Sequence, residues 1–158
     1  MEALLIRRLN ECDADDVASL VRRNALEVNI KDYPEDAMIK LAQSYTVEKI
    51  LNIARFAHSY VACMGDLIVG CGSIAGFWDS QEESILLTIF VLPEFHGKGI
   101  GKEIIRTLEQ DEYALRAKRI EIPSSITACE FYRKLGYDYK DGIKKLDEES
   151  LYRLEKLR

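Results

Sequence analysis

An apolar segment, a cluster of glycines and a helical pattern follow one another directly, and this succession constrains the fold more than any other feature. The apolar run from Ile85 to Leu92 is rich in β-branched residues and stops at Pro93, as a buried strand does. Glycines then occupy positions Gly97, Gly99 and Gly101. The apolar residues of the next segment recur at helical spacing: Ile100, Ile104, Ile105 and Leu108. The sequence therefore predicts a strand, a tight turn and the start of a helix.

A strand, a glycine turn and a helix N-terminus together form a device that can hold phosphate. The first N–H groups of a helix have no partner within the helix, and the helix dipole adds partial positive charge there. Glycines let an oxygen-rich ligand approach the backbone, and Lys98 and Lys102 add positive charge beside the turn. The spacing fits neither a P-loop nor a dinucleotide fingerprint. A tight turn without any ligand is the structural alternative.

A second motif follows a short predicted strand at Lys118 to Ile122. It reads Ser125-Ile-Thr-Ala128-Cys-Glu-Phe131-Tyr132-Arg-Lys-Leu-Gly136-Tyr137. Together with His96-Gly-Lys-Gly99-Ile-Gly101, it resembles the GNAT superfamily of acyl-CoA-dependent N-acetyltransferases. Members carry a Gln/Arg-x-x-Gly-x-Gly/Ala turn and, further on, Asn-x-x-Ala-x-x-Phe-Tyr-x-x-x-Gly-Phe/Tyr. This chain departs from the commoner pattern at His96, in place of Gln or Arg, and at Ser125, in place of Asn.

The resemblance implies one N-acetyltransferase domain over residues 1–158, of the α/β (α+β) class. We expect a mixed, mostly antiparallel sheet of about 6–7 strands, with helices on both faces and a splayed central strand. Residues 151–158 fit a helix by their leucine spacing, whereas the resemblance implies a last strand that pairs with Tyr137 to Lys140. We adopt the strand.

Local patterns predict the remaining elements. An edge strand is expected at Ala3 to Leu9, and a hairpin at Tyr60 to Met64 and Leu67 to Gly70 around Gly65-Asp66. A helix is expected at Ala14 to Glu27, with Asp13 as its N-cap and an apolar stripe of Val17, Leu20, Val21 and Leu26. Val28 to Asp36 reads as a connection, and a second helix begins near Thr46 and ends at His58. The glycines from Gly70 to Gly76 indicate a bulge or a close backbone approach.

Composition excludes several classes of partner. The net charge is −5 and the sequence has no basic run, which argues against nucleic acid. Without a leading apolar run we expect no signal peptide and no membrane, so the cytoplasm is the expected location. The four cysteines, Cys12, Cys63, Cys71 and Cys129, lack metal-ligand spacing. They are expected to be buried or half-buried thiols, with no metal site.

The resemblance also implies acetyl-CoA (coenzyme A) as cosubstrate. Backbone N–H groups around Lys98 to Lys102 are expected to bind its pyrophosphate. The backbone of the central strand is expected to bind the pantetheine arm, with the Val91 N–H on the thioester carbonyl oxygen. The expected cofactor-binding set is Phe90, Val91, Leu92, His96, Gly97, Lys98, Gly99, Ile100, Gly101, Lys102, Ser125, Ala128 and Tyr132.

Tyr132 matches the tyrosine that family members place near the cofactor sulfur as general acid. A phenol stays protonated at neutral pH and can donate a proton to a thiolate. No carboxylate lies on the central strand, so Glu82 and Glu83 are the candidate bases, and a water relay is an equal alternative. The acceptor pocket is expected from variable segments that carry Tyr33, Trp78 and Asp79.

The leading function is therefore transfer of an acetyl group from acetyl-CoA to a primary amine on a small molecule or a protein. An acyl-CoA-binding regulatory or interaction module without turnover is the alternative, and a plain interaction domain without a cofactor is a third. The identity of the amine stays open. The oligomeric state also stays open, a homodimer included.

Overall fold

The computed structural model describes residues 3–78 and 80–158, and its centre is a single seven-stranded sheet. The strand order is β1-β2-β3-β4-β5-β7-β6. The strands are β1 (Leu4–Arg8), β2 (His58–Met64), β3 (Leu67–Gly76), β4 (Glu83–Val91), β5 (Arg119–Ser124), β6 (Asp138–Tyr139) and β7 (Tyr152–Leu157). Neighbours pair antiparallel except β4 and β5, which run parallel. This is the predicted mixed, mostly antiparallel sheet.

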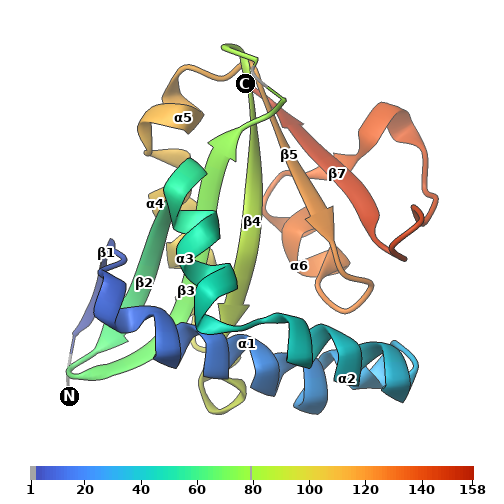
Figure 1. The fold of residues 1–158 in the computed structure, drawn as a ribbon. Coiled ribbons are helices and arrows are strands. Elements are labelled where there is room, and N and C mark those ends of the chain that lie inside the picture. Colours follow the sequence, from blue (N-terminus) through green and yellow to red (C-terminus); the bar gives the residue numbers. More distant parts are fainter. Residues whose placement is uncertain (1–2, 79) are drawn as a thin grey trace.

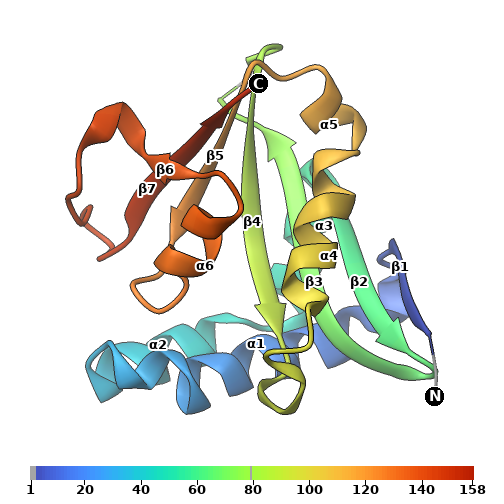
Figure 2. The ribbon, with the colours of Figure 1, turned by 180° about the vertical axis from the view of Figure 1, so that it is seen from behind.

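Helices cover both faces of the sheet, as expected. The α-helices are α1 (Ala14–Glu27), α2 (Glu35–Ser44), α3 (Val47–Phe56), α4 (Ile100–Glu109), α5 (Glu112–Leu115) and α6 (Cys129–Lys134). Short 3-10 helices are η1 (Glu11–Asp13), η2 (Asn29–Lys31), η3 (Pro93–Phe95) and η4 (Lys140–Gly142). Figure 1 shows α1, α2 and α3 on the near face, and Figure 2 shows α4 and α6 on the opposite face. Among the described residues no helix is long and apolar enough to cross a membrane.

Helix α4 lies unusually close to β3 because β3 has glycines where the helix crosses it. The predicted stripe of α4 is buried against the sheet: Ile100, Ile104, Ile105 and Leu108. A β-carbon on Gly70 would lie 2.8 Å from Ile104 Cδ1, and one on Gly72 would lie 2.7 Å from Ile104 Cγ2. Both distances are too short for a real contact, so the close backbone approach predicted from these glycines is confirmed.

Several local predictions hold. The hairpin turns at Gly65 with φ 61°, and Met64 pairs with Leu67. The Thr46 side chain accepts a hydrogen bond from the Lys49 N–H at 3.1 Å and so caps α3. The C-terminal segment is a strand, β7, and it pairs with β6 as adopted. Its longer ladder, however, is with β5 over the whole length of that strand, which the sequence did not indicate.

Helix α2 was not predicted: the expected connection ends at Asp36, and no element was assigned between Asp36 and Thr46. Its buried side consists of Met38 and Ala42, which pack with Ala25 of α1 in a small cluster separate from the main core. With two buried positions among ten residues, the spacing of apolar residues in α2 is too weak to indicate a helix.

Four local assignments are corrected. Asp13 does not cap α1 with its side chain; its carboxylate instead binds Arg7, at 2.8 Å, and the Asn10 N–H. Leu26 is exposed, and the buried stripe of α1 continues through Asn24 instead. His58 begins strand β2 rather than ending a helix. Cys12 is exposed, whereas the other three cysteines are buried as expected.

Candidate active site

Within the described chain, the sheet opens between two adjacent long strands at one place, where β4 separates from β5. Strand β4 pairs with β5 at Glu83, Ser84 and Ile85, and the pairing stops there. Beyond Ile85 the two strands diverge, as Figure 1 shows, while β3 continues to pair with β4 as far as Val91. The second half of β4 therefore presents one backbone edge that no strand covers. The expected splayed central strand is confirmed.

A β-bulge lies at the point where the two strands separate. Cys71 of β3 pairs with Phe90, but Ser73 pairs with Leu87, so two residues of β4 oppose one residue of β3. Thr88 takes φ 54°, a conformation that a β-branched residue rarely adopts. The Cys71 thiol donates to the Thr88 carbonyl oxygen at 3.3 Å. Bulges of this kind redirect the strand and are common beside active sites.

At the end of β4, one N–H group is paired with no strand of the described residues. The Leu92 N–H donates to the Val69 carbonyl at 2.8 Å, so Leu92 faces β3. Backbone groups alternate in direction along an antiparallel ladder, so both groups of Val91 face the open side. The Val91 carbonyl oxygen accepts from Asn24 Nδ2 at 2.9 Å and from His96 Nε2 at 2.8 Å. The Val91 N–H has no strand opposite it.

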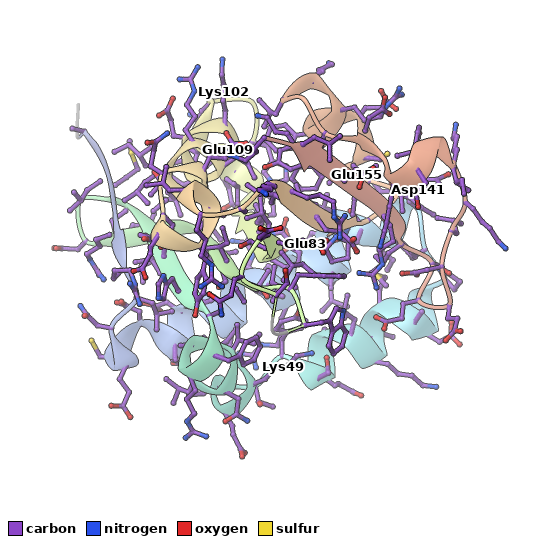
Figure 3. All side chains as sticks on the ribbon, turned by 90° about the horizontal axis from the view of Figure 1, so that it is seen from above. Lys49, Glu83, Lys102, Glu109, Asp141 and Glu155 are labelled. Atoms are coloured by element: carbon purple, nitrogen blue, oxygen red, sulfur yellow. The ribbon has the colours of Figure 1, made fainter. Side chains whose placement is uncertain are left out.

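The glycine turn follows one short helix, η3, after this strand. Gly97 and Gly99 have φ of 76° and 81°, where glycine is favoured, and apart from the adjoining residues no described atom lies within 4 Å of a β-carbon built on either. Within the described chain no side chain caps α4, so the N–H groups of its first turn point into this open space. Lys98 and Lys102 form no ion pair within the described chain, and Figure 3 shows Lys102 on the α4 side of the sheet. The turn thus has the geometry of an anion site.

Tyr132 stands beside this turn on helix α6. Its neighbour Phe131 contacts Gly101 in the first turn of α4, which joins the two helices. The Tyr132 ring is buried, and its hydroxyl has no hydrogen-bond partner in the described part of the chain. Every fully buried polar side-chain atom described does have a partner, so the Tyr132 oxygen reaches solvent.

The electrostatics around Tyr132 favour the neutral phenol. Burial raises the pKa of Tyr132 well above its ordinary value, and the charge of a Cys71 thiolate would raise it further. Burial also raises the pKa of Cys71, to about 12, so this thiol stays neutral. Tyr132 therefore keeps its proton at neutral pH.

Ser125 and Ala128 act locally on the loop that leads into α6. The Ser125 Oγ accepts from the Ala128 N–H at 3.1 Å, which fixes the last turn before the helix. Tyr33 binds the same loop: its hydroxyl accepts from the Ile126 N–H and donates to the Ser150 carbonyl, both at 2.8 Å. The hydroxyl of Tyr33 is therefore fully engaged in the fold.

The other predicted residues lie at the opposite end of β4. Glu83 binds Arg119 at 2.6 Å, and Glu82 lies 3.2 Å from Lys118. From Glu83 to Val91 the strand extends roughly 26 Å at the usual rise per residue. Figure 3, which looks along the sheet from that end, shows Glu83 near Glu155, the second carboxylate bound by Arg119. Trp78 is also at this end and 85% exposed, and Asp79 lies outside the described residues.

Sequence reasoning missed three residues at this site. Asn24 binds the Val91 carbonyl, Thr88 forms the bulge, and Tyr45 packs its ring against Phe90 at 6.4 Å between centroids. The sequence contains one signal that could have identified Asn24: this residue continues the helical spacing of the buried stripe in α1. A polar residue on an apolar stripe needs a buried hydrogen-bond partner.

Comparison with known proteins gives consistent results. A family model described as an acetyltransferase (GNAT) domain matches residues 55–139. No curated protein matches the sequence. The fold is similar to that of the PaiA N-acetyltransferase from Thermoplasma acidophilum in complex with coenzyme A, at 19% identity, with 99% of both chains covered and a TM-score of 0.84.

Two further solved structures share this fold. One is aminoglycoside 6'-acetyltransferase type Ii, at 17% identity, with 97% of this chain and 96% of that chain covered and a TM-score of 0.75. The other is N-acetylglutamate synthase from Neisseria gonorrhoeae, complexed with coenzyme A and L-arginine, at 14% identity and a TM-score of 0.67. There the match covers 99% of this chain and 34% of the longer one. At these identities the likeness shows the fold alone.

Proposed function

The chain belongs to the GNAT acetyltransferase family, because the model of that family matches more than half of the chain, and we propose that residues 1–158 act as one N-acetyltransferase domain. The acetyl donor is acetyl-CoA and the acceptor is a primary amine that attacks the thioester directly. The observation that carries this proposal is the Val91 N–H on the open edge of β4, at the end of the strand that leads into the glycine turn.

The glycine turn fits a pyrophosphate. The space beside Gly97 and Gly99 is open, and the uncapped N–H groups of α4 point into it. Hydrogen bonds to a charged group contribute about 1.5–3 kcal/mol each. Several backbone donors around Lys98 to Lys102 therefore suffice for binding, and the side chain of His96 has no required part because it already donates to Val91.

The open edge of β4 fits the pantetheine arm and the thioester. Backbone groups from Phe90 to Leu92 lie along this edge, and we assign the Val91 N–H to the thioester carbonyl oxygen. A fixed donor stabilises the negative charge that develops on this oxygen as the amine attacks, most strongly where water is excluded.

Tyr132 supplies the proton that the leaving thiolate needs. Its hydroxyl has no hydrogen-bond partner among the described residues, and burial holds its pKa above the ordinary range, so it is protonated at every physiological pH. Phe131, the preceding residue, packs α6 against Gly101 in the first turn of α4.

Water is the base that the geometry favours. Glu82 and Glu83 are ion-paired with Lys118 and Arg119 at the far end of β4. A water molecule in the open edge can accept the proton from the amine before attack. Two structures with this fold are named as an aminoglycoside 6'-acetyltransferase and an N-acetylglutamate synthase, and such different names support no choice of acceptor beyond an amine. Trp78 lies at the Glu83 end of β4 and would contact only an extended acceptor.

The alternative, a coenzyme A-binding module without turnover, is favoured by one observation, namely that both candidate carboxylates lie away from Tyr132. A thiol-release screen with acetyl-CoA against small amines, polyamines, amino acids, aminoglycosides and peptide N-termini separates the two. The enzyme predicts amine-dependent release of coenzyme A. Thermal stabilisation by coenzyme A with no release on any amine would establish the binding module.

A further inference from the structure

The side-chain amide of Asn24 holds the end of β4 from inside the protein. Asn24 is 4% exposed, although its residue type is usually found at the surface. Its Nδ2 group donates to the Leu20 carbonyl of its own helix at 3.1 Å and to the Val91 carbonyl at 2.9 Å. Both hydrogens of this amide are therefore used. One bond fixes the amide to α1, and the other fixes Val91 to the amide.

The peptide between Val91 and Leu92 is consequently held from two sides. Asn24 and His96 donate to its carbonyl oxygen, and its N–H group donates to Val69 of β3. His96 is exposed and belongs to the turn that a ligand would occupy, whereas Asn24 is buried in a helix of fourteen residues. Of the two side chains that donate to the Val91 carbonyl, Asn24 is therefore the one held in a fixed position.

We propose that Asn24 is a positioning residue, which aims the Val91 N–H at the thioester carbonyl oxygen by holding the Val91 carbonyl against α1. This inference rests on the proposed function, since it gives the Val91 N–H its ligand. Without the Asn24 amide, the exposed His96 is the one side-chain donor left on the Val91 carbonyl among the described residues, so the end of β4 is held less firmly against α1. The adjacent N–H group then loses its direction, although the glycine turn is unchanged.

The test compares two ligands that differ only in the thioester carbonyl, acetyl-CoA and S-ethyl-coenzyme A, by calorimetry without any amine. A neutral hydrogen bond is worth about 0.5–1.5 kcal/mol, so wild type should bind acetyl-CoA about threefold to tenfold more tightly than the thioether. Asn24→Ala should reduce this ratio to about one, with coenzyme A affinity changed by less than about threefold. Asn24→Leu, which fills the space without a donor, serves in the same way if the alanine variant does not fold.

Arg23→Ala is the matched control. Arg23 is the preceding residue of α1 and binds Glu94 of η3, so it also links the helix to the end of β4, but it does not touch Val91. This variant should keep the wild-type ratio. If both Asn24 variants still bind acetyl-CoA more tightly than S-ethyl-coenzyme A, as wild type does, the positioning role is overturned. It is also overturned if wild type binds the two ligands equally. The thiol-release screen tests acetyl transfer separately. If wild type prefers acetyl-CoA, the Asn24 variants lose this preference and no amine gives turnover, then the positioning role of Asn24 stands and the proposed enzymatic activity is wrong.

Discussion

Phe131 lies so close to Gly101 that a β-carbon on the glycine would come within 2.9 Å of the Phe131 Cζ atom. The third glycine of the turn therefore serves the packing of α6 on α4, and its φ is not in the left-handed region. Gly97 and Gly99, by contrast, adopt positive φ beside open space. The three glycines of one motif thus do two different things, and different substitutions should separate them.

The effect of Gly101→Ala on the free energy of unfolding should change sign when Phe131 is replaced by alanine. In wild type the added methyl group overpacks against Phe131, at a cost of about 1–3 kcal/mol that outweighs the gain in helix propensity. In a Phe131→Ala background only the propensity remains, and the same substitution should raise the free energy of unfolding by about 1 kcal/mol. Urea unfolding of the four proteins measures both effects. Equal effects in the two backgrounds would show that Phe131 simply moves aside.

Gly99→Asn should remove coenzyme A binding without unfolding the turn. Asparagine tolerates positive φ better than valine or alanine, so the backbone is kept while a side chain enters the open space. The affinity should fall by more than about tenfold, or 1.4 kcal/mol, in calorimetry. Gly142→Asn is the control, because Gly142 also has positive φ and open surroundings but lies in η4. If both variants bind like wild type, the pyrophosphate is not held at this turn.

His96→Ala should alter the KM for acetyl-CoA by less than about threefold. The imidazole is exposed and donates to the Val91 carbonyl, so water can replace it on that oxygen while Asn24 keeps its own bond. Steady-state kinetics beside Gly99→Asn provide the comparison. A loss as large as that from the asparagine variant would mean that the imidazole itself binds the cosubstrate.

Asp111 should make the fold sensitive to acid. Its buried carboxylate accepts from Tyr60, from the Tyr113 N–H and from His58. Burial alone would raise the pKa of Asp111, but these hydrogen bonds outweigh it and hold the pKa below its usual value. A depressed pKa gives stability that is present above about pH 4 and is lost as the pH falls through the folded-state pKa.

Asp111→Asn should therefore lower the melting temperature near neutral pH, and the difference from wild type should shrink as the pH falls below about 4. Asp66→Asn in the exposed β2–β3 turn is the control and should leave the melting temperature unchanged at each pH. A difference that stays constant down to low pH would show that the charge of Asp111 contributes nothing.

The parts of this molecule that could be predicted are those that the local sequence encodes. The glycine turn and the stripe of α4 follow from backbone conformation and helical spacing, and both are as expected. The splay of β4 came only from the family resemblance, because nothing in Ile85 to Leu92 shows where pairing with β5 ends. Asn24 could not be assigned to Val91 because the two are 67 positions apart, and only the packing of α1 on β4 joins them.

Tyr132→Phe should lower kcat by about 10²–10⁴ while coenzyme A affinity is retained, because the ring keeps its packing and only the proton donor is lost. Tyr137→Phe is the matched control: that phenol is also buried, but its hydroxyl donates to Glu109 at 2.9 Å. Its loss should cost about 1 kcal/mol of stability and leave kcat unchanged. Since burial raises the pKa of Tyr132, the wild-type rate should show no loss of the acid at neutral or mildly alkaline pH. A Tyr132→Phe enzyme within about threefold of wild type at every pH would return this residue to the core and leave the thiolate to be protonated by water.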